Sequence, residues 1–533
     1  MFHRLILLAA NSNLTKFKCR AAIHCHACLV RRQYPVPSHH LLRSRLLSTS
    51  CNMKDSPTAH QHDAVRNLLP DLLTSKDSSK GSLGRSLMMS DAHIRQVCSH
   101  YRQLNQASKV DFLLALSQLC GVNHEVVFRA AKNMESVQEK EEATVMQSEQ
   151  RLTQSLTPGY KLLFSQIGRL EGGVKFLVDM RADIRFLQQR QNLSSDAHLR
   201  ALKDALREML AHWFSAGLLQ LQTITWQSSC EMLQKISEYE AVHPVRGWAD
   251  LKRRVGAYRR CFVYTHSSMP QEPVVVLHAA LMDHIPSGVQ SIVGERRDQM
   301  SRETPLVLEE QEDPERIKAA IFYSLTSTQK GLWGVDLGNY LIKHAVRTLQ
   351  GDFPQLSMFS SLSPIPGFCS WLLAEIGRHH KGENSTTLFT SEELQGIQKL
   401  SGRCDESELE TVRRLLSTNQ WAQSEQLLRV FECPLMRLCA RYLYLEKRRG
   451  FALDPVANFH IRNGAVMWRL NWMGDPSPRG LTASCGMMVN YRYYLESTLE
   501  NSQNYTVDKT IAATQQVLSL VEESQLIEQK SSL

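Results

Sequence analysis

The spacing of hydrophobic residues has a helical period in the first half of the chain and a strand period in the second. Across residues 91–228, apolar residues recur every three or four positions, as at Phe112, Leu116 and Leu119. This period predicts amphipathic helices, and we interpret the stretch as a helical domain for packing or assembly. After Trp248 the apolar residues form short runs separated by turn residues, which is typical of strands.

Several of these runs predict neighbouring strands. Residues 261–266 and 274–281 flank a turn that contains Pro270, so they predict a β-hairpin. Residues 319–325 have the length and composition of a buried strand, and residues 356–361 predict another strand after a helix. The expected fold class is therefore α+β and multi-domain, with an all-helical N-terminal domain followed by a mixed α/β domain.

A polar turn with two glycines, Gly331 and Gly334, lies between the third of these runs and a helical pattern from Gly338 to Leu349. Glycine lets backbone N–H groups approach a ligand without a Cβ in the way. The start of the following helix offers unsatisfied amides and the positive end of its dipole, which favour phosphate. The pattern predicts a phosphate-binding loop, but a simple turn at a helix start would show the same two glycines.

A second turn signal lies closer to the C-terminus. Asn463 and Gly464 form a dipeptide that is typical of a two-residue hairpin turn. Val466 and Trp468 follow with the alternation of one face of a strand. The sequence therefore predicts a β-hairpin here, with His460 beside it.

The net charge of +9 is confined to the first 54 residues, which hold nine Lys or Arg and no Asp or Glu. Subtracting these nine from the 62 basic residues leaves 53, which equals the number of acidic residues. The rest of the chain therefore has no electrostatic reason to bind nucleic acid. A basic, Ser-containing and acid-free arm is typical of a mitochondrial transit peptide, so we expect import into the mitochondrial matrix.

The expected boundaries follow from these patterns. Residues 1–53 are the expected transit peptide, 54–88 a linker, 89–228 the helical domain and 229–533 the α/β domain. Translation from Met53 would omit the arm and give a cytoplasmic form.

Two further sequence features bear on location. The chain ends in Ser531-Ser532-Leu533, which is similar to the peroxisomal address Ser-Lys-Leu but has Ser in place of the basic residue. No apolar run approaches the length that a bilayer requires, so no integral membrane segment is expected.

Five stretches of the chain together resemble malonyl-CoA decarboxylases. They are FSSLSPIPGF (359–368), ALDPVANFHIRNGAV (452–466), LTASCGMMVNYRY (481–493), RVGAYRRC (254–261) and EMLQKISEYEAVHPV (231–245). The resemblance implies that malonyl-CoA is the substrate and that acetyl-CoA and CO₂ are the products. It also implies that no metal or organic cofactor takes part, because the thioester itself accepts the electron pair.

The matching motifs imply two catalytic residues. Ser363 is the last serine of SSLSP, and His460 belongs to NFH. The resemblance implies that His460 donates a proton to C2 of the enolate, while Ser363 holds the malonyl carboxylate or orients the imidazole. Histidine suits this role because its ordinary pKa lies near neutrality. Without the resemblance, Ser363 would fit a turn or helix cap, and His460 would fit a buried core histidine.

The substrate-binding residues implied by the resemblance come from a strand end, the glycine loop and a tyrosine-rich run. They are Ser324, Gln329, Gly331, Gly334 and Tyr493. Asp336 stands where the family usually has Glu, and a catalytic role for it stays open because a carboxylate in the first turn also complements the helix dipole.

The predicted order of hairpin, strand, glycine loop, helix, strand and helix is similar to the GNAT acyl-CoA transferase fold. The resemblance implies that CoA lies between two splayed strands, with its pyrophosphate on the glycine loop. The sequence departs from the family motif Q/R-x-x-G-x-G/A, because Trp333 follows where Gly331 fills the first glycine position.

Two other functions remain open from the sequence. One is a CoA-dependent acetyltransferase of GNAT fold, and the other is a CoA-sensing or assembly protein without turnover. The amphipathic faces of the helical domain predict a homo-oligomer, such as a tetramer. Cys230 is the first candidate for a crosslink between subunits.

Overall fold

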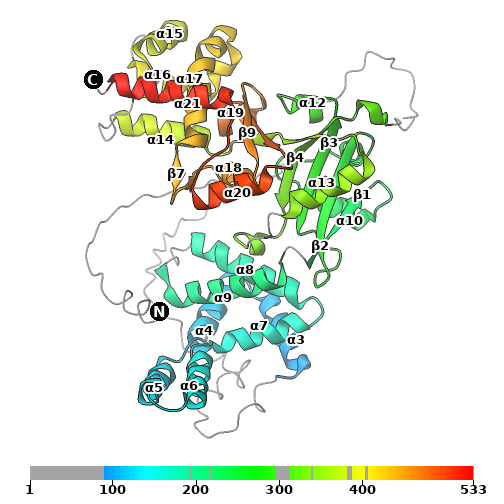
Figure 1. The fold of residues 1–533 in the computed structure, drawn as a ribbon, viewed down its shortest axis with the longest axis vertical. Helices are drawn as coiled ribbons and strands as arrows, with labels where there is room; N and C mark the ends of the chain where they lie inside the picture. Colours follow the sequence, from blue (N-terminus) through cyan, green and yellow to red (C-terminus); the bar gives the residue numbers. More distant parts are fainter. Residues whose placement is uncertain are drawn as a thin grey trace, which may run out of the picture. The chain divides into compact units, whose positions relative to one another are not determined.

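The computed structural model describes residues 89–190, 195–215, 218–293, 312–335, 337, 340–380, 387–402 and 406–531 (Figure 1). The predicted transit peptide and linker, Met53, Asp336 and Gly338 lie outside these described residues, as do the last two residues of the peroxisome-like C-terminus.

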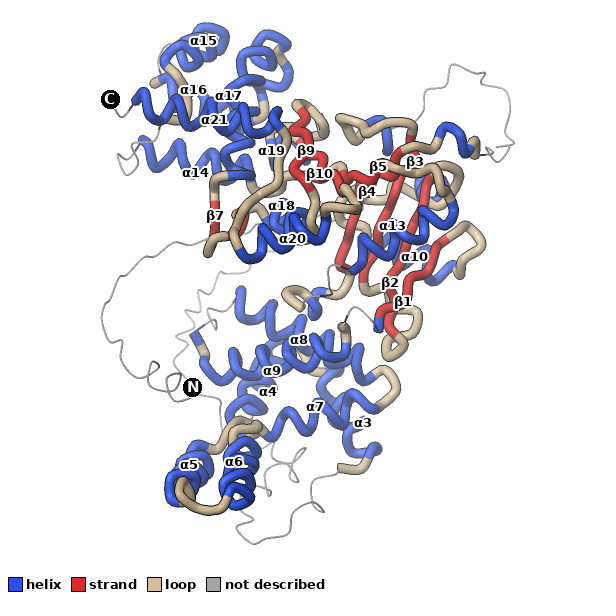
Figure 2. Tube along the Cα trace, in the orientation of Figure 1, coloured by secondary structure: helices blue, strands red, loops and turns tan. Residues whose placement is uncertain are grey.

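The first described part of the chain is helical, as predicted (Figure 2). Its helices are α3 (Asp91–Gln103), α4 (Gln106–Leu119), α5 (His124–Ser136), α6 (Glu142–Ser155), α7 (Gly159–Arg169), α8 (Gly173–Arg190) and α9 (Ala197–Trp213). The side chains of Ser90, Asn105, Asn123 and Asp196 accept hydrogen bonds from backbone amides at four of the helix starts. One face of most helices packs into a shared apolar core that includes Leu113, Phe164 and Leu202.

The helical prediction is wrong for residues 219–224, which form strand β1 (Leu219–Ile224). This segment, LQLQTI, alternates apolar and polar residues, which suits a strand better than a helix. It pairs antiparallel with the next strand along the chain, from Leu219 opposite His266 to Ile224 opposite Cys261.

Among the described residues, eight strands form one sheet in the order β1-β2-β3-β4-β5-β10-β6, with β9 also paired to β10. The other seven are β2 (Arg259–His266), β3 (Val275–Met282), β4 (Ala319–Ser327), β5 (Met358–Ser361), β6 (Ser363–Pro364), β9 (Val466–Asn471) and β10 (Met488–Tyr493). The predicted hairpin of β2 and β3 and the predicted strands β4 and β5 are confirmed.

Strands β4 and β5 run parallel but stay paired over only four residue pairs. Their register begins with Ala319 opposite Met358 and ends with Phe322 opposite Ser361. Beyond Phe322, β4 continues to Ser327 without β5 beside it. A β-bulge in the pairing with β3 falls at the same place, since Phe322 lies opposite Ala279 and Ser324 opposite His278. The two central strands therefore separate at the end of β4 that leads into the glycine loop.

Helices cover both faces of the sheet. Those beside the strands are α10 (Cys230–Tyr239), α11 (Trp248–Arg254), α12 (Gln290–Val293) and α13 (Tyr340–Asp352), whereas α14 (Phe368–His380) packs among the C-terminal helices. Ile342 and Leu349 of α13 pack with Phe322, whereas Ile236 of α10 packs with Val263 in a separate cluster. Because both faces are covered, β4 is buried along most of its length.

The C-terminal part adds mostly helical structure next to β9 and β10 (Figure 1). Its helices are α15 (Ser391–Ser401), α16 (Glu408–Thr418), α17 (Glu425–Tyr444), α18 (Pro455–Arg462), α19 (Pro478–Ser484), α20 (Thr498–Val507) and α21 (Gln515–Ser531), and a short hairpin joins β7 (Lys447–Arg448) to β8 (Phe451–Ala452). Single 3₁₀ turns among the described residues include η3 (Pro314–Arg316), η4 (Lys330–Leu332) and η5 (Gln420–Gln423). No described helix is long and apolar enough to cross a bilayer.

The predicted β-hairpin at Asn463 and Gly464 is wrong. These residues end helix α18, where the Gly464 amide donates to the Ile461 oxygen at 2.9 Å and the Ala465 amide donates to the His460 oxygen at 3.1 Å. Gly464 has a φ of +82°, which is the left-handed conformation of a glycine that closes a helix. The same dipeptide suits both structures because both need a residue with positive φ.

We predict that Gly464→Ala lowers the free energy of unfolding by about 2 kcal/mol or more, because alanine resists positive φ. A Cβ at this position would also lie 1.9 Å from the backbone oxygen of Thr498. Urea titration checks this, with Gly377→Ala as the matched control. Gly377 lies within α14 and has open space around its Cβ position, so alanine there should leave stability unchanged or raise it by up to about 1 kcal/mol. Equal effects of the two substitutions would contradict the prediction.

Candidate active site

Ser363 and His460, which lie 97 residues apart in the sequence, meet in a buried hydrogen bond. The Ser363 Oγ lies 2.9 Å from the His460 Nε2. Ser363 is on β6, which pairs with β10 through Val489, and His460 is in the last turn of α18. The side chains are only 4% and 6% exposed, so little water reaches the pair in this state.

The other ring nitrogen of His460 also has a hydroxyl partner. The Tyr493 hydroxyl lies 2.7 Å from Nδ1, and the Tyr491 ring stacks on the imidazole with centroids 4.6 Å apart. Both tyrosines belong to β10 and are two residues apart, so the pleat turns both side chains toward one face. On the opposite side of the imidazole, the Ser363 hydroxyl donates to the Ser361 Oγ at 2.8 Å. Four side chains thus form a hydrogen-bonded row from Tyr493 through His460 and Ser363 to Ser361.

Helix α18 holds His460 in place through its N-terminal cap. The Asp454 carboxylate accepts hydrogen bonds from the amides of Val456 at 2.9 Å and Ala457 at 2.8 Å, and Pro455 occupies the first helical position. Asp454 is fully buried, and this burial raises its pKa to about 6. The sequence Asp-Pro-Val-Ala thus predicts a helix start that the hairpin interpretation overlooked.

Burial also determines the charge of the imidazole. Removal from water disfavours the charged form and lowers the pKa of His460 to about 3. The same effect raises the pKa of the Tyr493 hydroxyl far above its ordinary value. At neutral pH the row therefore contains a neutral imidazole between two neutral hydroxyl groups. The near-neutral pKa that made histidine a suitable proton donor in the sequence analysis is not kept in the fold, because burial disfavours the imidazolium.

Ser324 lies in a different buried polar cluster. Its Oγ donates to the Glu240 carboxylate, at 2.9 Å from Oε1 and 2.8 Å from Oε2. The Nε2 of His278 lies 3.4 Å from the same carboxylate, and burial lowers the pKa of His278 to about 4. No hydrogen bond in the described part of the chain joins Ser324 to Ser363 or His460. Sequence reasoning did not single out Glu240 or His278. Only their contacts in the fold show that these two residues form a buried polar cluster with Ser324.

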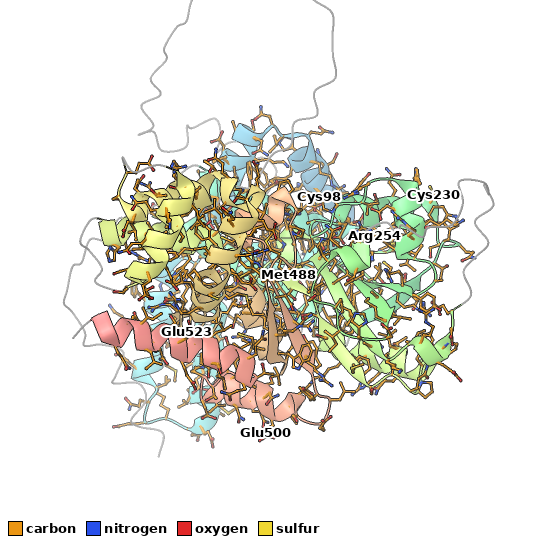
Figure 3. The ribbon with its side chains drawn as sticks, turned by 90° about the horizontal axis from the view of Figure 1, so that it is seen from above. Cys98, Cys230, Arg254, Met488, Glu500 and Glu523 are labelled. Atoms are coloured by element: carbon orange, nitrogen blue, oxygen red, sulfur yellow. The ribbon has the colours of Figure 1, made fainter. Side chains whose placement is uncertain are left out.

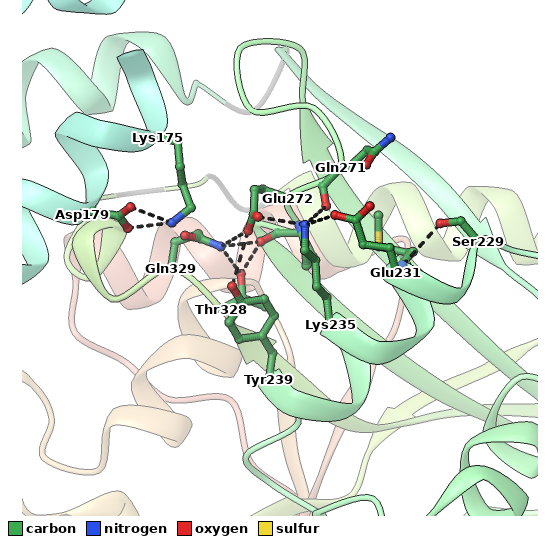
Figure 4. Close-up of polar contacts among 12 residues, drawn as sticks. Lys175, Asp179, Ser229, Glu231, Lys235, Tyr239, Gln271, Glu272, Thr328 and Gln329 are labelled. Carbon is green, nitrogen blue, oxygen red and sulfur yellow. Dashed lines mark hydrogen bonds and ion pairs between the residues drawn. The ribbon is translucent and has the colours of Figure 1, made fainter. Parts of the chain in front are cut away.

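The three predicted residues of the glycine loop have different surroundings. The Gln329 Nε2 donates to the Pro273 oxygen at 3.0 Å, next to the contacts of Lys235 with Glu231 and Glu272 (Figure 4). Gly331 is buried against helix α8, whereas Gly334 has a φ of +77° and open space where a Cβ would lie. Only Gly334 therefore leaves its Cα side open to a ligand.

Ser361 and Tyr491 are the site residues that sequence reasoning missed beside His460. Each lies two residues from a predicted site residue, Ser361 from Ser363 and Tyr491 from Tyr493. Period-two spacing within β10 would have pointed to Tyr491, because alternate residues of a strand face the same side. Ser361 ends β5 and Ser363 begins β6, so no single strand links those two serines.

A separate cavity of about 1030 Å³ lies beside α11 and the start of β2. Neither Ser363 nor His460 lines it. Within the described residues, no group of three or more Cys, His, Asp or Glu side chains is placed to bind a metal ion.

Comparison with protein families places this chain in a known group. A family model for the malonyl-CoA decarboxylase C-terminal domain matches residues 217–531, and one for the N-terminal domain matches residues 120–214. The chain belongs to the malonyl-CoA decarboxylase family. Members of this family are enzymes, and the chain is one as well.

Individual relatives agree with this assignment. The chain is 50% identical over 430 residues to "Malonyl-CoA decarboxylase, mitochondrial" of Mus musculus, covering 80% of this chain and 85% of that protein. It is 48% identical over 433 residues to the protein of the same name from Anser anser anser, with 80% and 82% covered.

Solved structures show the same fold. The crystal structure of malonyl-CoA decarboxylase from Rhodopseudomonas palustris matches with a TM-score of 0.70 at 26% identity, covering 86% of this chain and 99% of that chain. The structure of the protein from Agrobacterium vitis matches with a TM-score of 0.68 at 29% identity, with the same coverage.

We predict that the burial of His460 makes the protein less stable in acid. The folded pKa is about 3 and the ordinary value is 6.5, so below pH 6.5 the unfolded chain takes up a proton that the folded protein excludes. The free energy of unfolding should therefore fall as pH falls, and His460→Gln should reduce this slope between pH 4 and 6 by about 1.4 kcal/mol per pH unit. Urea titrations across that range check this, with the exposed His124→Gln as the control. An unchanged slope in His460→Gln would contradict the buried neutral imidazole.

Proposed function

We propose that this chain decarboxylates malonyl-CoA to acetyl-CoA and CO₂, with protonation of the resulting enolate by His460. The observation that carries the mechanism is the buried row Tyr493–His460–Ser363. Breaking the bond between C2 and the carboxylate leaves its electron pair on C2 and the thioester carbonyl. The enzyme must then stabilise an oxyanion and deliver one proton to carbon.

The surroundings of Tyr493 indicate where the imidazole proton lies. Within the described part of the chain, the hydroxyl of Tyr493 forms a hydrogen bond with His460 alone. If the Tyr493 hydroxyl accepted a hydrogen bond from an Nδ1–H, its own buried O–H would have no acceptor. Leaving such a donor without a partner costs about 1–3 kcal/mol. We therefore propose that Tyr493 donates to Nδ1, so that the proton of the neutral ring sits on Nε2 and points to Ser363.

This direction makes the row a path for a proton. The Nε2–H of His460 faces Ser363, whose hydroxyl in turn donates to Ser361. A malonyl carboxylate that displaces Ser361 as the acceptor would be held by Ser363 next to the imidazole. When CO₂ leaves, C2 takes the place of the carboxylate, and the Nε2–H of the neutral His460 protonates it directly or through the Ser363 hydroxyl. The ring then regains a proton at Nδ1 from the Tyr493 hydroxyl, and Tyr493 is reprotonated from water as acetyl-CoA leaves. Water exclusion by the buried pair protects the enolate from uncontrolled protonation.

The CoA part of the substrate would lie where β4 and β5 separate. We propose that this domain has a GNAT-like fold, supported by the parallel pair of strands that diverges beyond Phe322 and Ser361 and by the glycine loop after β4. Gly334 would admit the pyrophosphate, since its Cα side is open. Gln329 would contribute less directly, because its amide already binds Pro273. Ser324 follows the bulge at this divergence, and Glu240 would orient it.

Purified protein of residues 53–533, incubated with malonyl-CoA alone, tests the activity. Acetyl-CoA and CO₂ should form without an acceptor. Release of free CoA that depends on an added amine would instead indicate an acetyltransferase, and binding without turnover would indicate a sensor.

We predict that His460→Ala lowers kcat by about 10²–10⁴-fold, the usual contribution of general acid catalysis. Ser363→Ala should also lower kcat. The double variant should be far less than multiplicatively worse, because the two side chains act together. Binding of malonyl-CoA should persist, since we propose that the nucleotide end binds at the glycine loop and not at these two side chains. A folded His460→Ala enzyme with a near wild-type kcat would remove His460 from the mechanism.

Divisions at residues 53 and 88 remain our proposal, as does import into the mitochondrial matrix. Because β1 pairs with the sheet, we propose that the α/β domain begins before Leu219 rather than at residue 229. The names of the relatives support import, and fusion of residues 1–53 to a reporter tests it; a reporter that stays in the cytoplasm would contradict it. A peroxisomal form through Ser531-Ser532-Leu533 and a cytoplasmic form from Met53 are further proposals, tested by the same fusions.

We further propose a homo-oligomer such as a tetramer. Exposed apolar side chains on the α5–α6 helix pair support it, with Phe128 66% and Met146 61% exposed. Cys230 is exposed at the start of α10, so it could crosslink neighbouring subunits on oxidation (Figure 3). Light scattering of the purified protein measures the mass, and a monomer at micromolar concentration would contradict the proposal.

A further inference from the structure

One face of helix α8, in the helical domain, lies directly against the glycine loop. Val178, Arg181 and Arg185 are three and four residues apart, so they share this face. A Cβ on Gly331 would lie 1.8 Å from the backbone oxygen of Val178, so only glycine allows this approach. Figure 4 shows the preceding turn of the same helix, with Lys175 and Asp179, near the loop residue Gln329. The loop is therefore shaped by a domain that contains none of the predicted catalytic residues.

Two arginines of this face hold the backbone of the loop. The Arg181 guanidinium donates to the Gly331 oxygen and, at 3.1 Å, to the Trp333 oxygen. Arg185 donates to the same Trp333 oxygen at 3.2 Å, and its guanidinium lies 5.8 Å from the centre of the Trp333 ring. Hydrogen bonds from a charged donor are about twice as strong as neutral ones, so these contacts fix the loop firmly.

Neither arginine forms an ion pair with a carboxylate in the described part of the chain, although the Asp204 carboxylate of α9 acts on Arg181 from farther away. The described ion pairs of α8 are Lys175–Asp179 and Lys109–Asp183. The Arg181 side chain is 1% exposed, and its Nε is buried without a hydrogen-bond partner. Burial lowers the pKa of Arg181 to about 10, which still leaves it charged at neutral pH. A buried cation without an ion-pair partner is unfavourable, and a nearby anion would stabilise it.

The loop leaves room for such an anion on its other side. Gly334, next to Trp333, has a positive φ and nothing within 4 Å of its Cβ position. Arg185 is only partly buried and uses one of its five N–H donors on the loop carbonyl. Its planar fork can offer two parallel N–H groups to a phosphate.

We propose that helix α8 is part of the substrate site, with Arg181 as a positioning residue for the loop and Arg185 as a ligand for a phosphate group of CoA. This rests on the proposed phosphate role of the loop. It gives the helical domain a share in substrate binding, in addition to packing and assembly. The specificity it supplies is for the phosphorylated nucleotide end of the thioester, and the acyl end is left to Ser363 and His460.

The test measures KM and kcat for malonyl-CoA, together with binding of 3′,5′-ADP by calorimetry as a probe of the phosphate end that does not depend on turnover. Arg185→Gln should raise both KM and the Kd of 3′,5′-ADP about tenfold, with kcat nearly unchanged. It should also flatten the dependence of KM on salt, because one phosphate contact is lost, and Arg185→Lys should restore that dependence. Arg181→Met should raise KM by about tenfold or more, and unchanged circular dichroism will show that it folds.

Arg207→Gln is the matched control, since Arg207 is an exposed arginine of neighbouring α9 whose charge acts on Arg181 without bonding to the loop. It should leave KM and salt dependence unchanged. Gly334→Val separates this proposal from the one on which it rests. If Gly334→Val raises KM while a folded Arg185→Gln does not, the loop binds phosphate and α8 does not take part. If neither variant changes KM or the Kd of 3′,5′-ADP, the phosphate role of the loop fails, and the role of α8 fails with it.

Discussion

The structure of the site depends on keeping His460 away from water. An imidazole that is nearly fully buried stays neutral, and both of its nitrogens then need partners within the protein. Ser363 and Tyr493 provide them from β6 and β10, and Tyr491 covers the ring face. The pairing of β10 with β6 therefore does more than extend the sheet, because it sets the distance between the two hydroxyl groups that hold the ring.

Helix α18 is the third element that this burial requires. It must place His460 against the sheet. The backbone amides at its buried N-terminus have no partner within the helix, so hydrogen-bond acceptors elsewhere in the protein must satisfy them. Asp454 does this with two short hydrogen bonds, at the cost of a buried carboxylate whose pKa rises to about 6. Gly464 ends the helix in a left-handed conformation that lets the chain turn at once into β9. A fixed start and a fixed end leave the helix little freedom to rotate His460 out of line.

The proposed binding site for the CoA part of the substrate is formed by the separation of two strands and by a loop that a distant helix holds. The β4–β5 pair opens beyond Phe322, and the loop after β4 is held by contacts with a helix far earlier in the chain. The two glycines of this loop have different roles. Gly331 lacks a Cβ so that helix α8 can pack against it, whereas Gly334 has open space where a Cβ would lie. One polar cluster near this opening, Ser324 with Glu240 and His278, is as buried as Ser363 and His460, and no described hydrogen bond joins it to them. We interpret the contacts of this cluster as the interactions that orient the Ser324 side chain.

The sequence by itself determined the broad division into a helical part and a mixed α/β part, because periods of 3.6 and 2 reflect local backbone geometry. The long motifs around Ser363 and His460 also identified the family, which the comparisons confirm. Local signals failed where two structures share the same local requirement. Asn463-Gly464 meets the need for positive φ in a hairpin and at a helix end alike, and only the packing of α18 on the sheet decides between them. The tertiary structure alone assigned Gly331 to contact with α8, brought Glu240 to Ser324, and placed Tyr493 on the far nitrogen of His460. These are contacts between residues from 33 to about 150 positions apart, and no local pattern of side chains encodes which of them will meet.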